Sequence, residues 1–139
     1  MVEFFIGLVL FAVTAAIFHK QRLDVRWFAI FMVFLPSVYM LFALSVGDSQ
    51  ALMWEFIYGL PYFAAGLICF RSGVKAGMLV VIGLWALHAF YDLYHERLVA
   101  NAGVPDWYPL LCFGYDLAVC AYLFWHLNGR RQGSFDAGS

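Results

Sequence analysis

Five long hydrophobic segments, separated by short polar ones, run along the chain. A helix needs about 20 apolar residues to cross a hydrocarbon layer about 30 Å thick, because it rises about 1.5 Å per residue. Each segment reaches or approaches that length, and the first is the shortest. The pattern therefore predicts an all-α, polytopic bundle of five transmembrane helices, with expected bounds Glu3–Phe18, Trp27–Val46, Ala51–Phe70, Ala76–Tyr94 and Trp107–Leu127.

The two ends of the chain bear on this prediction. If the first segment does not span, four helices remain and the N-terminus lies on the other side of the membrane. The start Met1-Val2-Glu3 has no basic region, so we expect a retained helix rather than a cleaved signal peptide. We expect a single transmembrane domain over residues 1–127. The polar tail, residues 128–139, contains several Gly and Ser residues and is expected to be disordered.

The composition agrees with a membrane protein. Hydrophobic residues make up 65% of the chain and charged residues 12%, whereas a soluble domain has about 45–50% and about 25%. The net charge of −1 and the lack of a basic patch argue against nucleic acid as a partner. Membrane lipids are the expected partners. The three cysteines show no paired metal-binding spacing and are expected to pack as small apolar residues.

The basic residues predict an orientation. Basic residues accumulate on the cytoplasmic side of membrane proteins. With the N-terminus outside and the C-terminus in the cytoplasm, Arg97 alone lies outside. Seven basic residues then lie inside: Lys20, Arg22, Arg26, Arg71, Lys75, Arg130 and Arg131. We expect this topology, in a bacterial inner membrane.

Five ionisable side chains fall within three of the predicted helices, all in the outer half. An ionisable group inside a bilayer costs at least about 2.5–3.5 kcal/mol on insertion scales and suggests a function. The set is larger than helix packing requires. It consists of Glu55, His88, Asp92, His95 and Asp116.

Helical geometry arranges these residues further. At about 100° per residue, His88, Asp92 and His95 fall within an arc of roughly 60°, so they form one polar stripe. We take His95 and Trp107 as the outer boundary of the membrane. Measured from that boundary at about 1.5 Å per residue, His88 and Asp116 both lie roughly 10–13 Å deep. We therefore expect two tiers, with His88 and Asp116 below Glu55, Asp92 and His95.

This set suits three kinds of role. Carboxylates and imidazoles bind divalent zinc, iron, manganese or copper, so all five residues are candidate metal ligands and candidate catalytic residues. One ion cannot easily take both His88 and His95, which start about 10 Å apart along the helix axis. Without a metal, a carboxylate and a histidine could transfer a proton to or from a substrate. The third interpretation is a buried pair, His88 with Asp92, that only holds helices together.

Two further features lie near the polar set. Tyr39, Tyr58 and Tyr62 are expected either to line a cavity beside it or to pack in the core. The segment Asn101–Pro109 is rich in turn-forming residues and precedes the last helix. We expect this loop to cover the site.

The region Leu84–Tyr122 resembles a family of small bacterial and fungal integral membrane proteins that is catalogued as a domain of unknown function. The resemblance is carried by Trp85-x-x-His88-x-x-x-Asp92-x-x-His95, a Pro-containing loop and Cys112-x-x-x-Asp116. Glu96 departs from the family pattern, in which a second His follows the position of His95. The family brings no assigned reaction. A looser architectural similarity is to sterol-isomerase-like membrane proteins, in which carboxylates and a His face a lipid-accessible cavity.

These observations predict a membrane-embedded, metal-dependent enzyme that acts on a hydrophobic substrate such as a lipid or isoprenoid. One alternative is a protein that binds or transports a cation or protons, in which case so small a chain is expected to form a homo-oligomer. Another is an accessory subunit of a membrane complex, without catalysis.

Overall fold

The structure is a computed structural model, which describes residues 1–21, 23, 27–72 and 75–136, without the side chains of 72, 75, 76 and 129–136. All regular structure in these residues is helical, as predicted. The helices are α1 (Val2–Gln21), α2 (Trp27–Ser45), α3 (Ser49–Ser72), α4 (Lys75–Leu98) and α5 (Tyr108–Asp136). All five are long and apolar enough to cross a membrane, including α1, so the five-helix prediction is confirmed over the four-helix alternative.

The outward faces of the helices are apolar. Leu41 on α2 is 61% exposed, Phe90 on α4 58% and Trp125 on α5 71%. An apolar surface this extensive is stable against lipid and not against water. The protein is therefore an integral membrane protein whose outer surface contacts lipid. Arg22 and Arg26, which contributed to the predicted orientation, lie outside the described residues.

The turn between α2 and α3 is formed by local hydrogen bonds. Gly47 has a φ of 71°, a left-handed conformation that glycine adopts readily. The N–H groups of Gly47 and Asp48 donate to the carbonyls of Leu44 and Ala43, which is the Schellman ending of a helix. The Asp48 carboxylate then accepts from the N–H of Ala51 at 2.9 Å and caps the start of α3.

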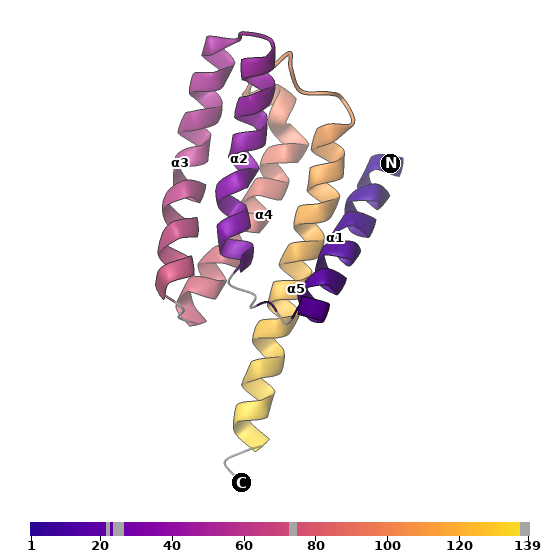
Figure 1. Ribbon diagram of the computed structural model, residues 1–139, viewed down its shortest axis with the longest axis vertical. Coiled ribbons are helices and arrows are strands. Elements are labelled where there is room, and N and C mark those ends of the chain that lie inside the picture. Colours follow the sequence, from indigo (N-terminus) through magenta and orange to yellow (C-terminus); the bar gives the residue numbers. More distant parts are fainter. Residues whose placement is uncertain (22, 24–26, 73–74, 137–139) are drawn as a thin grey trace.

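The helices pack in a definite order (Figure 1). α2 packs on α3, and α5 lies between α1 and α4, so α1 is the outermost helix on its side of the bundle. The contact between α1 and α5 is close at two glycines. A Cβ at Gly7 would meet the carbonyl oxygen of Leu111, and one at Gly114 would meet that of Phe4. Small residues let membrane helices approach in this way.

The interior of the bundle has an apolar half and a polar half. Phe28, Met32, Trp85 and Leu123 belong to an apolar core around the first half of α4. The polar half lies near the α2–α3 turn and the loop between α4 and α5. Trp85 lies where the apolar half meets the polar half. Its indole N–H donates a hydrogen bond to the carbonyl of Phe28 at 3.2 Å.

The last helix is longer than the hydrophobic segment from which it was predicted. α5 continues past Leu127 to Asp136, so the backbone of residues 128–136 is helical where we expected a disordered tail. Extending an existing helix requires no new nucleation, which is the costly step in helix formation. Residues 137–139 lie outside the described part of the chain.

Candidate functional site

One buried seam of α4 supplies three of the candidate residues. Its members recur at intervals of three or four residues, the spacing that keeps side chains on one face of a helix. All are at most 3% exposed. In chain order they are Val81, Trp85, His88, Asp92 and His95 on α4, followed by Val99 in the same register just beyond its end. The middle of an otherwise apolar seam is therefore polar.

The deeper part of the site joins His88, Asp92 and Asp116, and we call it the deep group. Nδ1 of His88 lies 2.9 Å from Oδ2 of Asp116 on α5. The same nitrogen lies 3.5 Å from Oδ1 of Asp92, one turn further along α4. The three residues are 1–2% exposed, and each offers a ligand atom within 4.8 Å of the others.

Three atoms of the deep group have no hydrogen-bond partner among the described residues. They are Nε2 of His88, Oδ2 of Asp92 and Oδ1 of Asp116. Buried polar atoms in proteins are nearly always paired, and each exception calls for an explanation such as an ion, a water molecule or a catalytic role. The deep group therefore retains unused bonding capacity.

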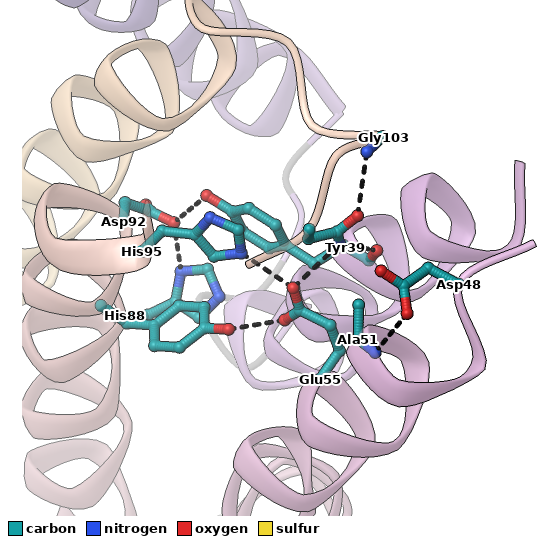
Figure 2. A network of polar contacts seen from close by, with 10 residues as sticks. Tyr39, Asp48, Ala51, Glu55, His88, Asp92, His95 and Gly103 are labelled. Atoms are coloured by element: carbon teal, nitrogen blue, oxygen red, sulfur yellow. Dashed lines mark hydrogen bonds and ion pairs between the residues drawn. The ribbon is translucent and has the colours of Figure 1, made fainter. Parts of the chain in front are cut away.

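The shallower part of the site is built around Glu55 of α3, and we call it the Glu55 group. Oε1 of Glu55 lies 2.8 Å from Nε2 of His95 and accepts a hydrogen bond from Nδ2 of Asn101 at 3.0 Å. Oε2 accepts from the Tyr91 hydroxyl at 2.5 Å. Both carboxylate oxygens are thus engaged, and Figure 2 shows Glu55 at the centre of these contacts.

Tyr39 of α2 connects the two groups. Its hydroxyl donates to Oδ1 of Asp92 at 2.8 Å, and its ring stacks on His95 with centroids 4.3 Å apart. Its backbone carbonyl accepts the second hydrogen bond of Asn101, at 3.0 Å. Tyr39 is fully buried, so it fixes α2, α4 and the α4–α5 loop relative to one another (Figure 2).

All five residues selected from the sequence are buried in the same half of the bundle. His88 meets Asp116, and Glu55 meets His95, each in the tier expected. The structure places Asp92 differently, in the deep group with His88. Side chains on a helix lean toward its N-terminus, which carries Asp92 back toward His88 and away from His95. Glu55 and His95 contact each other and lie outside the three-residue donor group.

Two members of the network were not selected from the sequence. Tyr91 lies three residues after His88 and four before His95, so helical spacing alone could have placed it beside both. Asn101 follows the end of α4, and its side chain reaches Glu55 across 46 residues of sequence. Its position depends on the path of the loop, which no local pattern predicts. The loop does cover one end of the site through Asn101, as expected.

Two spaces adjoin the site from opposite directions. A pocket of about 360 Å³ lies under the α4–α5 loop and is lined by His95, Glu96, Asn101 and Asp106, among others. A cavity of about 10 Å³ lies between α2, α3 and α4, with Glu55 and His88 in its wall. The pocket has both polar and apolar lining residues and reaches the end of the bundle, while the cavity lies inside the membrane-spanning part.

Comparison of the chain with protein-family models, curated proteins and solved structures gave no match. The family resemblance described above therefore stays a prediction, and the function has to be argued from the geometry of the site.

Proposed function

We propose that this protein is a membrane-embedded enzyme that holds a divalent metal ion between His88, Asp92 and Asp116 and acts on a hydrophobic substrate. The observation that carries the proposal is the deep group itself. Three buried donor residues converge there, and each of the two carboxylates keeps one oxygen without a partner in the described part of the chain. Mixed imidazole and carboxylate ligands suit zinc, iron, manganese or copper.

The spacing of the donor atoms supports an ion. Two ligands bound to one ion at about 2.1 Å lie about 3.0–3.4 Å apart in octahedral or tetrahedral geometry. Nδ1 of His88 is 2.9 Å from Asp116 and 3.5 Å from Asp92, so small shifts would suffice. The hydrogen bond from Tyr39 to Asp92 is of the kind that orients a metal ligand from outside.

Charge balance supports the same assignment. With a neutral imidazole, the deep group carries two negative charges in a region that excludes water. A divalent ion would neutralise them, and an uncompensated pair of carboxylates there would be strongly unfavourable. Both oxygens of Glu55 already accept hydrogen bonds, from three donors in all. We therefore assign Glu55 and His95 to positioning the site rather than to binding the ion.

The setting supports a hydrophobic substrate. The site lies inside a bundle whose outer surface contacts lipid. A bound divalent ion supplies Lewis-acid chemistry, either by polarising a carbonyl oxygen or by activating a bound water. Asp92 and Asp116 would hold the ion, and His88 would contribute its ring nitrogen.

A second candidate mechanism is favoured by the His88 ring. One ring nitrogen faces two carboxylates and the other has no partner among the described residues, which is the arrangement of a histidine oriented to act as a general base. In this case the enzyme would transfer protons on the same class of substrate without a metal.

Metal analysis of the detergent-purified protein separates the two mechanisms. We expect about one ion per chain in the wild type and in the exposed control Glu96→Gln, and loss of the ion in His88→Gln and Asp116→Asn. If the wild type holds no stoichiometric ion, and added zinc or manganese leaves its melting temperature unchanged, the metal site is wrong. Deuterium uptake from D₂O into lipids of a membrane extract, absent in His88→Gln, would then support the general-base mechanism.

Catalysis needs a test of its own. The extract, incubated with wild type and with His88→Gln, is compared by mass spectrometry. A lipid converted only by the wild type supports an enzyme. Metal binding with no conversion of any lipid would favour a protein that binds or transports a cation.

We also propose an inner-membrane location with the site toward the outside. This is supported by Lys20 and Arg71, which end α1 and α3 at the end of the bundle opposite the α4–α5 loop. Reporter fusions at the C-terminus are expected to read as cytoplasmic.

We also propose that the protein forms a homo-oligomer. Light scattering of the protein–detergent complex, which measures the mass of the assembly, tests this.

A further inference from the structure

A groove runs between α3 and α4 on the outside of the bundle. Its volume is about 420 Å³, within the range of about 300–1,000 Å³ typical of small-molecule sites. Its walls include Ile57, Leu87, Phe90 and Leu98, and none of the described residues that line it is charged. Both helices are long and apolar enough to span the membrane, so the groove faces the hydrocarbon of the bilayer.

Three tyrosines separate this groove from the site. Tyr58, Tyr62 and Tyr91 line both the groove and the cavity of about 10 Å³ that His88 and Glu55 also line. A cavity of that volume holds about one water-sized group. The groove can therefore take a long apolar chain, while the space behind the tyrosines takes a single polar atom.

The His88 ring supplies a bonding partner inside this cavity. Its Nδ1 faces Asp116 and Asp92. The two nitrogens of an imidazole lie on different edges of the ring, so Nε2 is directed away from those carboxylates. Nε2 is buried and has no partner among the described residues, and His88 is in the wall of the cavity. An oxygen atom in the cavity could bond to it.

We propose that the groove and the cavity together bind a lipid that ends in a single hydroxyl group, which can donate a hydrogen bond to Nε2. The chain of this lipid lies between α3 and α4, and its oxygen reaches Nε2 of His88. This inference names the substrate class of the proposed enzyme for the mechanism in which His88 acts as a general base. It rests on that function for its catalytic meaning, although binding itself can be measured separately.

Size and charge define the polar end. A phosphate or sugar headgroup is too large for a cavity of about 10 Å³. The one acidic residue named in its wall, Glu55, already accepts three hydrogen bonds, so most of its acceptor sites are occupied. The polar end of the ligand is therefore small and uncharged.

The tyrosines also define the route. Tyr91 is held by its hydrogen bond to Glu55, whereas Tyr58 is 38% exposed on the lipid side. Tyr62 packs its ring edge-on against His88, with centroids 5.2 Å apart. A lipid oxygen would pass when Tyr58 and Tyr62 turn aside, and Tyr91 would stay in place.

Three probes with the same chain length test the proposal on the protein in lipid nanodiscs. A hexadecan-1-ol that carries a diazirine in mid-chain is photo-crosslinked, and unlabelled hexadecan-1-ol, hexadecane and hexadecyl phosphate compete with it. We expect crosslinks on α3 and α4. Hexadecan-1-ol should compete at about five- to tenfold lower concentration than hexadecane, the gain typical of one net hydrogen bond.

Two matched variants place the site. Leu87→Trp fills the groove and should abolish crosslinking. Val80→Trp, two turns earlier on α4 and outside the groove, should leave it unchanged. Neither residue belongs to the polar network, so both variants are expected to fold.

Several outcomes would overturn the proposal. Equal competition by hexadecane would show that no polar subsite exists. Stronger competition by hexadecyl phosphate would place a headgroup at Arg97, which lies 5.7 Å over the ring of Tyr94 at the groove. Equal crosslinking of Leu87→Trp would place the probe elsewhere.

Metal content, measured on the same samples, distinguishes failure of the lipid site from failure of the metal site. If the protein holds no metal but prefers the alcohol, only the metal site is wrong. If the protein holds metal but shows no preference for the alcohol, only the lipid site is wrong.

Discussion

Glu55 offers the sharpest test of whether the polar network holds the bundle together. It is 1% exposed and accepts hydrogen bonds from Tyr91, His95 and Asn101. In Glu55→Leu, all three groups lose their shared acceptor. A buried polar group left unpaired costs about 1–3 kcal/mol, so the sum is about 3–9 kcal/mol if the penalties add. Breaking a buried ion pair typically costs about 3–5 kcal/mol, and we expect a loss in that range.

Glu55→Gln is expected to be milder. The amide oxygen can keep the contacts with His95 and Asn101, and the Tyr91 hydroxyl can rotate to accept from the amide nitrogen. What disappears is the charge, which makes each hydrogen bond roughly 1 kcal/mol stronger. Three such bonds give an expected loss of about 2–3 kcal/mol. The order of stability should therefore be wild type, then Gln, then Leu.

The free energy of unfolding can be measured by titrating the protein from mild detergent into sodium dodecyl sulfate and following its helix content. Glu96→Gln and Glu96→Leu are the matched controls, because Glu96 is exposed on the neighbouring helix and should change stability by no more than about 0.5 kcal/mol. An unchanged or higher stability in Glu55→Leu would refute the reasoning. It would mean that the free-energy cost of burying the carboxylate is at least as large as the stabilisation from its hydrogen bonds.

Three further predictions follow from single contacts. Gly7→Leu should lower the melting temperature, because its side chain would collide with the α5 backbone, whereas Gly83→Leu, with open space around it, should not. Asn101→Ala should speed amide hydrogen exchange over the α4–α5 loop, since it removes the side-chain bonds to Tyr39 and Glu55 and the one accepted from Gly103. Trp85→Phe should cost about 1 kcal/mol through the lost hydrogen bond to Phe28, measured by the same titration, and an effect near zero would show that this bond is dispensable.

The sequence predicted the features that depend on one helix at a time. Segment length and hydropathy were enough for five spans, and the 3.6-residue period was enough to put His88, Asp92 and His95 on one face. Comparing depths across helices also paired His88 with Asp116, because antiparallel spans share the same two membrane boundaries.

What the sequence did not predict depends on how helices rotate and approach one another. The partner of Asp92 follows from the direction of a single side chain. The roles of Asn101 and Gly7 depend on a loop path and on the contact between α1 and α5. Packing of the whole bundle sets these features, and no local pattern in the chain records them. The proposed metal and the proposed reaction would depend further on the chemistry of an ion and a substrate, which hydropathy does not record.

The hydrogen bond between Asn101 and Glu55 also bears on how the protein is made. Asn101 follows Glu55 by 46 residues, and chains grow at roughly 5–20 residues per second, so roughly 2–9 s separate the two during synthesis. His95 and Tyr91 emerge only slightly before Asn101. Throughout that interval α3 carries a carboxylate whose partners do not yet exist, at a cost of several kcal/mol in open lipid. We therefore expect α3 to remain at the insertion machinery until α4 joins it, so that the two helices enter the bilayer as a pair.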